Sequence, residues 1–188
     1  MTINELKEIC INDSIPILRD KTLEYIINII KENKIKSILE IGTAYGYSSF
    51  AFNQIDCVNE ILSIEKNKDN YLKAKNFLAG NKKINLVNDD CFDFVPNKKY
   101  DLIFIDGPKS HQDQLFLKYS SYLEDNGFII IDNIFLKKYS SIDFNSLTKN
   151  QQHLVKKVKE FQKWLENNNE WNINILDIDD GVAICHKK

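Results

Sequence analysis

The chain has 188 residues, of which 43% are hydrophobic and 28% are charged, and its formal net charge is -2. This length and composition predict one folded domain over residues 1–188. The charge argues against a protein that coats nucleic acid by bulk attraction. The four cysteines form no C-x-x-C pair, the first residues do not resemble a signal peptide, and no apolar run is long enough to span a membrane. We therefore expect reduced thiols, no membrane partner and a cytoplasmic location.

Strand and helix patterns alternate along most of the chain. Residues 1–16 are expected to form a helical turn or two, and apolar spacing predicts an amphipathic helix over 17–33. The next apolar runs predict strands at 38–41, 60–64, 84–87, 100–105 and 128–131, with helices at 50–55, 69–78 and 112–123. A polar link at 137–150 precedes a helix at 151–167 and two strand-like runs, at 172–178 and 182–186. The pattern indicates an α/β fold: a mostly parallel sheet with helices on both faces and an antiparallel C-terminal hairpin around Asp179-Asp180-Gly181.

One strand–turn–helix segment, residues 37–48, organises the N-terminal half. Its apolar strand ends at Gly42, and Gly46 follows just before the next apolar segment. A sharp turn from strand to helix needs glycine where the backbone bends or approaches a ligand, and the helix amides then point at that ligand. The spacing departs from the G-x-G-x-x-G pattern that binds a pyrophosphate. This departure favours a ligand with an amino acid end and a nucleoside end. A plain turn without a ligand is the alternative.

An acid or amide lies at the end of every predicted parallel strand, at the sheet edge where ligands of such folds bind. We expect Glu65 to accept hydrogen bonds from ribose hydroxyls, although it could instead only begin a helix. For Asp90, a turn cap and an acceptor for an adenine amino group are equally supported. Each of these acids therefore has a structural and a functional interpretation.

A second group of polar residues follows the next two predicted strands. Asp106, Asp132 and Asn133 offer the hard oxygen ligands that a Mg²⁺ site with retained waters uses, and three separate caps are the alternative. Lys109 lies three residues beyond Asp106. A nearby divalent cation would disfavour the charged form of Lys109, which makes this residue a candidate base, and a solvated surface lysine is the alternative.

The predicted helix at 151–167 carries lysines opposite its apolar face. Lys156, Lys159 and Lys163 share one side at 100° per residue. The span 137–163 holds seven lysines against two acids. This side is expected either to be solvated or to contact nucleic acid phosphates.

Three motifs together resemble the metal-dependent class I S-adenosylmethionine (SAM) O-methyltransferases of the catechol and caffeoyl-CoA type. They are Glu40-Ile-Gly-Thr-Ala-Tyr-Gly-Tyr-Ser48, Phe104-Ile-Asp-Gly-Pro-Lys109 and Ile131-Asp-Asn133. The likeness extends from about Ser14 to the C-terminus and includes the hairpin Ile178–Val182. It implies a Rossmann-like sheet of seven strands whose last strand is antiparallel.

The resemblance assigns roles to individual residues. Along the methionine end of SAM it implies a loop formed by Gly42, Ala44, Gly46 and Ser48 and supported by Glu40. Glu65 would hold the ribose, while Asp90 and Cys91 would flank the adenine. Mg²⁺ or a similar ion would be bound by Asp106, Asp132 and Asn133. Lys109 matches the catalytic lysine of the family. Besides binding the metal, Asp106 would take part in catalysis and contact SAM.

Small bacterial members of this family include the enzyme that converts 5-hydroxyuridine at the tRNA wobble position to 5-methoxyuridine. The predicted function is therefore this methyl transfer, with Lys156, Lys159 and Lys163 in contact with tRNA near the anticodon loop. Methylation of a small catechol-like phenol is the first alternative, and a non-catalytic SAM-binding domain is the second. The oligomeric state, including a homodimer, is left open.

Overall fold

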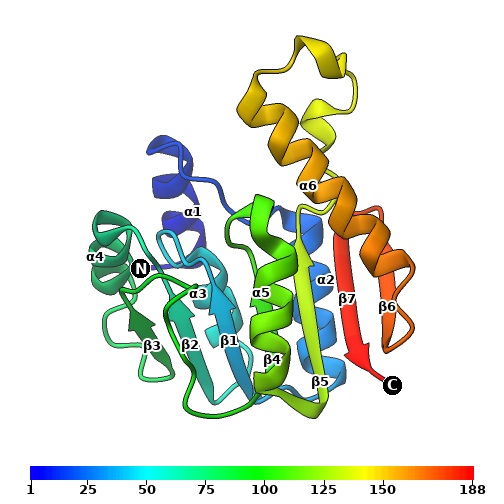
Figure 1. Cartoon of the computed structure of the whole chain (residues 1–188). Helices are drawn as coiled ribbons and strands as arrows, with labels where there is room; N and C mark the ends of the chain where they lie inside the picture. Colours follow the sequence, from blue (N-terminus) through cyan, green and yellow to red (C-terminus); the bar gives the residue numbers. More distant parts are fainter.

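The computed structural model describes all residues from Met1 to Lys188 and contains one seven-stranded sheet with the order β3-β2-β1-β4-β5-β7-β6 (Figure 1). The strands β1 to β5 pair in parallel, and β7 is antiparallel to both of its neighbours. The predicted Rossmann-like fold, with its antiparallel C-terminal hairpin, is confirmed. The strands are β1 (Ser37–Ile41), β2 (Glu60–Ile64), β3 (Ile84–Val87), β4 (Tyr100–Ile105), β5 (Leu123–Asp132), β6 (Trp171–Leu176) and β7 (Val182–Lys187).

Helices cover both faces of the sheet, because successive residues of each central strand point to opposite sides. Ile38 and Leu102 pack with α1, α2 and α3, whereas Leu39 and Ile103 pack with α5 and α6. These central strands are therefore buried on both sides, as their continuous apolar sequences predict. The helices are α1 (Ile3–Asn12), α2 (Asp20–Glu32), α3 (Tyr47–Asn53), α4 (Lys68–Phe77), α5 (Gln112–Tyr119) and α6 (Lys149–Glu166).

The two N-terminal helices are present, but the first is longer than predicted and the second begins later. The lead is a ten-residue helix, α1, begun by a capping box in which Thr2 and Glu5 bond each other's backbone amides. Helix α2 begins at Asp20 and not at residue 17, because the backbone of Arg19, the N-cap residue, is extended. The resulting segment 15–19 runs between the two helices without regular structure.

Three further boundaries differ from the sequence-based expectation. Strand β5 begins at Leu123 instead of residue 128, because pairing with β4 continues across a register shift. The exposed polar residues 124–126 hide this start in the sequence. Helix α5 ends at Tyr119, and a 3₁₀ turn covers the next three residues. The link before α6 contains two 3₁₀ turns, at Lys137–Tyr139 and Phe144–Ser146.

The strand order reverses at β1, which lies between β2 and β4, and this switch point is where ligands of open α/β sheets bind. The N-terminal half of α6 projects beyond the carboxyl edge of the sheet, and α1 lies on the other side of the same edge (Figure 1). We call residues 135–163 the arm. None of the helices combines the length and apolar character that crossing a membrane requires.

Candidate active site

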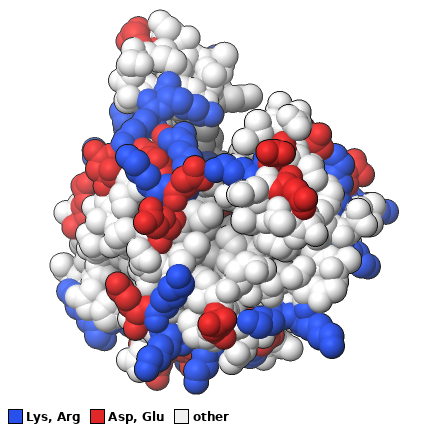
Figure 2. All heavy atoms as spheres, turned by 180° about the vertical axis from the view of Figure 1, so that it is seen from behind, with Lys and Arg blue, Asp and Glu red and all other residues white.

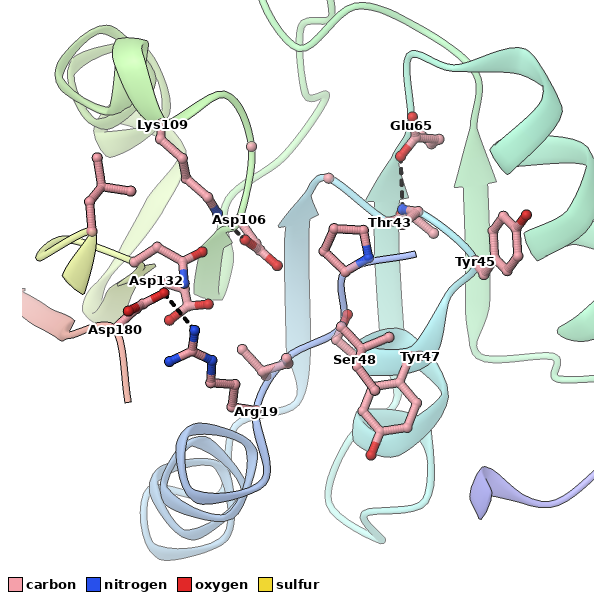
Figure 3. A pocket seen from close by; sticks show the side chains of 18 of the residues that line it. Arg19, Thr43, Tyr45, Tyr47, Ser48, Glu65, Asp106, Lys109, Asp132 and Asp180 are labelled. Atoms are coloured by element: carbon pink, nitrogen blue, oxygen red, sulfur yellow. Dashed lines mark hydrogen bonds and ion pairs between the residues drawn. The ribbon is translucent and has the colours of Figure 1, made fainter. Parts of the chain in front are cut away.

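A cavity of about 470 Å³ lies at the switch point (Figure 3). Its walls come from the segment 16–19, the loop after β1, the ends of β4 and β5, and the arm. Eight predicted site residues line it together: Gly42, Ala44, Ser48, Glu65, Asp106, Lys109, Asp132 and Asn133. The structure therefore brings the predicted methionine loop, the ribose acid and the metal ligands to one place.

The glycines of the loop after β1 have different surroundings. Gly42 has φ +96°, and a Cβ there would lie 2.6 Å from the carbonyl oxygen of Asp106. Only glycine therefore lets β1 and β4 approach so closely at their ends. Gly46, with φ +87°, is the N-cap of α3 and packs against Leu78, where a Cβ would lie 2.5 Å from Cδ1. Gly46 does not line the cavity, and its role is to let the turn pack closely against Leu78.

Glu40 lies beneath the loop and is completely buried. Its carboxylate accepts hydrogen bonds from the hydroxyls of Ser48, Ser49 and Ser63. Burial raises the pKa of Glu40, and these hydroxyls oppose that rise. The first turn of α3 is thereby tied to β1, which agrees with the supporting role predicted for Glu40. Sequence reasoning did not identify Ser49 and Ser63 as its partners.

Glu65 joins the large cavity to a second one of about 430 Å³. Its carboxylate accepts from the amide N–H of Ala44 at 2.8 Å and from that of Asn67 at 2.7 Å. The second cavity is also lined by Asp90 and Cys91, the predicted adenine residues. Both cavities share Gly42, Glu65, Asp106 and Gly107, so an elongated ligand can extend from one into the other.

The two adenine-side residues differ in how freely they can bind a ligand. Asp90 pairs with Lys66 at 2.6 Å and accepts from the amide of Phe92 at 2.9 Å. The hydrogen bond from Lys66 is the main reason that the pKa of Asp90 is lowered. Burial raises the pKa of the Cys91 thiol to about 11, so the side chain is a neutral, mostly apolar wall.

The predicted metal residues lie at the ends of β4 and β5. Lys109 forms an ion pair with Asp106, and both side chains are 25% exposed (Figure 3). Asp132 is only 5% exposed. Burial and the nearby charge of Asp106 raise its pKa to about 7. Asn133 follows with φ +59°, a left-handed conformation that asparagine tolerates better than most residues.

No group of three or more His, Cys, Asp or Glu side chains is arranged to hold a metal ion. The predicted set instead combines two carboxylates with the amide of Asn133. A neighbouring carboxylate disfavours the ionised form of a buried carboxylate, and a bound cation would stabilise that form. Asp106, Asp132 and Asn133 therefore fit a Mg²⁺ ion that keeps several waters, because such ions take few protein ligands, all of them oxygens.

Residues outside the predicted set complete the cavity. Arg19, the only arginine in the chain, pairs through Nη2 with Oδ2 of Asp180 at 2.8 Å (Figure 3). The adjacent Asp179 accepts from both the amide and the hydroxyl of Thr22, at 3.0 and 2.9 Å. The β6–β7 turn is thus fastened to the start of α2. The solitary arginine and the Asp-Asp-Gly turn were visible in the sequence, but nothing there indicated that they meet.

The arm supplies the remaining wall through Leu136, Lys138 and Leu154. The predicted tRNA residues Lys156, Lys159 and Lys163 are exposed on α6 and do not line the cavity. Lys156 lies 3.9 Å from Glu160, so its charge is partly offset. The structure therefore separates these lysines from the catalytic candidates.

Comparisons with known proteins identify the family and the fold. The family model of the O-methyltransferases matches residues 2–188. A Staphylococcus aureus protein named as a candidate caffeoyl-CoA O-methyltransferase is 33% identical, with a TM-score of 0.91 over 100% of this chain and 93% of that chain.

Two more distant structures share the fold. SAH-bound PaMTH1 of Podospora anserina is 21% identical, with a TM-score of 0.84 over 99% of this chain and 87% of that one. A Bacillus cereus O-methyltransferase in complex with SAH is 16% identical, with a TM-score of 0.81 over 99% and 90%. The family match over nearly the whole length, together with the catalytic candidates in one cavity, leads to one conclusion. The chain belongs to the O-methyltransferase family.

Proposed function

We propose that this enzyme transfers a methyl group from SAM to the hydroxyl of 5-hydroxyuridine at the tRNA wobble position, forming 5-methoxyuridine, with the help of a divalent cation. The observation that carries the proposal is the convergence of Asp106, Lys109, Asp132 and Asn133 in the cavity that the loop after β1 also lines. A protein that only bound SAM would need neither a base nor metal ligands at this position.

We expect SAM to lie across the two joined cavities in one direction. The amino acid end would lie by Gly42, Ala44 and Ser48, and the nucleoside end would pass Glu65 toward Asp90 and Cys91. Glu65 uses both carboxylate oxygens on backbone amides, yet each oxygen keeps a lone pair for a ribose hydroxyl. The proposal is supported by the P. anserina and B. cereus neighbours, which were solved with SAH.

The chain's own residues would orient the acceptor and remove its proton. A divalent cation held by Asp106, Asp132 and Asn133 would supply Lewis acidity that makes the acceptor hydroxyl more acidic. Lys109, in its neutral form, would take that proton at Nζ. The acceptor oxygen then bonds to the methyl carbon as the carbon–sulfur bond breaks, which requires in-line placement at about 3 Å. Acidic hydroxyls such as that of 5-hydroxyuracil suit this scheme better than aliphatic alcohols.

The lysines of the arm favour tRNA as the acceptor. Lys138, Lys149, Lys159 and Lys163 have no carboxylate within 4.0 Å, so their charges are available to phosphates. Basic side chains gather below the tip of the arm, beside the hollow at the carboxyl edge, although acidic ones lie among them (Figure 2). A local basic surface on a chain of net negative charge is an expected feature of a protein that binds RNA at one site.

A small catechol-like phenol is the second candidate acceptor. Apolar side chains of Ile17, Leu18, Leu136 and Leu154 line part of the cavity and would hold an aromatic ring without any RNA. Parallel assays with labelled SAM, one on tRNA containing 5-hydroxyuridine and one on catechol, separate the two candidates. Transfer to tRNA that stops in EDTA and in Asp132→Ala supports the proposal. Full turnover in EDTA would show that the reaction needs no divalent cation. Methyl transfer to catechol but not to tRNA would show that the acceptor is a small phenol.

A further inference from the structure

Two cationic side chains face the large cavity from separate walls, and neither belongs to the predicted catalytic set. Arg19 comes from the segment before α2, and Lys138 comes from the arm. The Arg19 side chain is 54% exposed and makes one hydrogen bond, to Asp180. A guanidinium carries five N–H donors, so four stay available. Lys138 is exposed, lies over the ring of Tyr139 and has no acidic partner.

The charged side chains that line the cavity nearly balance when Arg19 and Lys138 are included: the carboxylates are Glu65, Asp106, Asp132 and Asp180, and the cations are Arg19, Lys109 and Lys138. Asp106 pairs with Lys109, Asp180 pairs with Arg19, and Glu65 is bound by two backbone amides. Asp132 forms no ion pair within 4.0 Å, and its hydrogen bond with the backbone of Asn133 does not compensate for its burial. A divalent cation at the proposed metal site would offset Asp132 and add further positive charge. The loaded cavity would then attract an anion, and Arg19 and Lys138 are the donors at its walls.

We propose that Arg19 and Lys138 form a phosphate subsite of the acceptor cavity. This inference rests on the proposed methyl transfer and narrows its acceptor to a hydroxylated ring that carries a phosphate. The planar fork of arginine binds phosphate through two parallel hydrogen bonds, and lysine adds a point charge. The phosphate could belong to an RNA nucleotide or to a coenzyme A thioester, and the experiment below separates these sources.

Asp180 allows a control that distinguishes binding from folding. Arg19→Gln removes both the proposed phosphate donor and the ion pair that fastens the β6–β7 turn. Asp180→Asn removes the same ion pair but leaves the guanidinium in place. If Arg19 only fastens the turn, the two variants will show the same preference for phosphorylated acceptors. If Arg19 binds phosphate, Asp180→Asn will keep the preference for phosphorylated acceptors, and Arg19→Gln will lose it.

The test compares kcat/KM for 5-hydroxyuridine with that for 5-hydroxyuridine 3′,5′-bisphosphate, and for catechol with that for caffeoyl-CoA. We expect the unmodified enzyme to prefer one phosphorylated acceptor over its partner by about tenfold or more, as charge-assisted hydrogen bonds provide. That pair identifies the source of the phosphate. Arg19→Gln should abolish the preference, Lys138→Gln should reduce it, and Lys82→Gln, at the opposite edge of the sheet, should preserve it.

Binding provides a second reading that does not depend on turnover. Calorimetry on the protein loaded with SAH and Mg²⁺ should give a dissociation constant about tenfold lower for uridine 3′,5′-bisphosphate than for uridine, or for coenzyme A than for pantetheine. Equal affinities within both pairs, or equal losses in Arg19→Gln and Asp180→Asn, would overturn the subsite. If no acceptor is methylated, the proposed function is wrong, and these affinities still decide whether the phosphate subsite exists.

Discussion

Ionisation of Asp132 costs free energy in the folded protein because this side chain is buried beside a second carboxylate. Asp132 ends β5 almost completely buried, and the charge of Asp106 adds to the penalty of its ionisation. Its pKa is raised from 3.8 to about 7. Between these values the folded protein therefore binds a proton that the unfolded chain has released. Ionised Asp132 destabilises the protein unless a cation is bound beside it.

Asp132→Asn tests this cost directly. In metal-free protein, the free energy of unfolding should fall as the pH rises from about 4 to about 7, by as much as about 4 kcal/mol from this residue. The asparagine variant should lose this slope. At higher pH, Mg²⁺ should raise the melting temperature of the unmodified protein and not that of the variant. Equal stabilisation of both proteins by Mg²⁺ would contradict the metal role.

Gly46 and Gly80 allow steric contact to be separated from backbone strain, because both have φ +87°. A Cβ on Gly46 would lie 2.5 Å from Leu78, whereas a Cβ on Gly80 would meet nothing within 4 Å. Gly80→Ala should cost about 1 kcal/mol for the left-handed conformation alone. Gly46→Ala should cost a further 1–3 kcal/mol, roughly, from overpacking. Equal losses in urea titrations would show that Leu78 moves aside without cost.

At the scale of elements, three segments meet through Asp13, Tyr45 and Lys73. Lys73 donates to Asp13 and to the hydroxyl of Tyr45, both at 2.6 Å, and Tyr45 donates to Asp13 at 3.0 Å. Hydrogen bonds from Lys73 and Tyr45 lower the pKa of Asp13. This clamp ties the end of α1 and the middle of α4 to the loop after β1, which lines the large cavity.

Tyr45→Phe removes the hydroxyl of the clamp and keeps the ring that packs against Phe77. We expect the dissociation constant for SAM to rise about twofold to tenfold, the usual effect of one lost hydrogen bond on a structure that the ligand requires. Calorimetry gives this constant. Tyr71→Phe, which removes a hydroxyl elsewhere on α4, is the matched control. A rise of the same size in the control would exclude a specific role for the clamp.

The arm should contribute to tRNA binding through charge and not through catalysis. Replacing Lys156, Lys159 and Lys163 together by glutamine should weaken tRNA binding and reduce the slope of log affinity against log salt by about 2 to 3. The rate of methyl transfer to catechol should be the same in this triple variant as in the unmodified protein. The same replacements at Lys31, Lys34 and Lys36, at the opposite edge of the sheet, are the control. Identical salt slopes in the two triple variants would assign tRNA contact to another surface.

For the whole molecule, local patterns in the sequence predicted the sheet and the polar residues at its carboxyl edge. Continuous apolar runs identify buried strands, and the ends of parallel strands must meet at one edge, so Asp106 and Asp132 were predictable neighbours. Helix α1 was predicted too short, as one or two turns, although Thr2 and Glu5 have the spacing of a capping box. The start of β5 was missed because its first residues are polar and exposed.

Contacts between distant segments were beyond the reach of the sequence. Arg19 and Asp180 are 161 positions apart, and no periodicity joins them. The same holds for Asp13 and Lys73, which are 60 positions apart. Such pairs depend on how helices pack on the sheet, which side-chain spacing along one element cannot specify. Arg19 and Asp180 line the large cavity, and Asp13 and Lys73 hold Tyr45 of the loop after β1.

The central claim is that this cavity methylates the oxygen of 5-hydroxyuridine in tRNA. Its most direct test is incubation of the purified protein with labelled SAM, Mg²⁺ and total tRNA from a strain lacking the gene, followed by nucleoside mass spectrometry. The account predicts that 5-methoxyuridine appears as 5-hydroxyuridine disappears, and that Asp132→Ala produces none. Unchanged 5-hydroxyuridine with the unmodified protein, or the label on any other nucleoside, would contradict it.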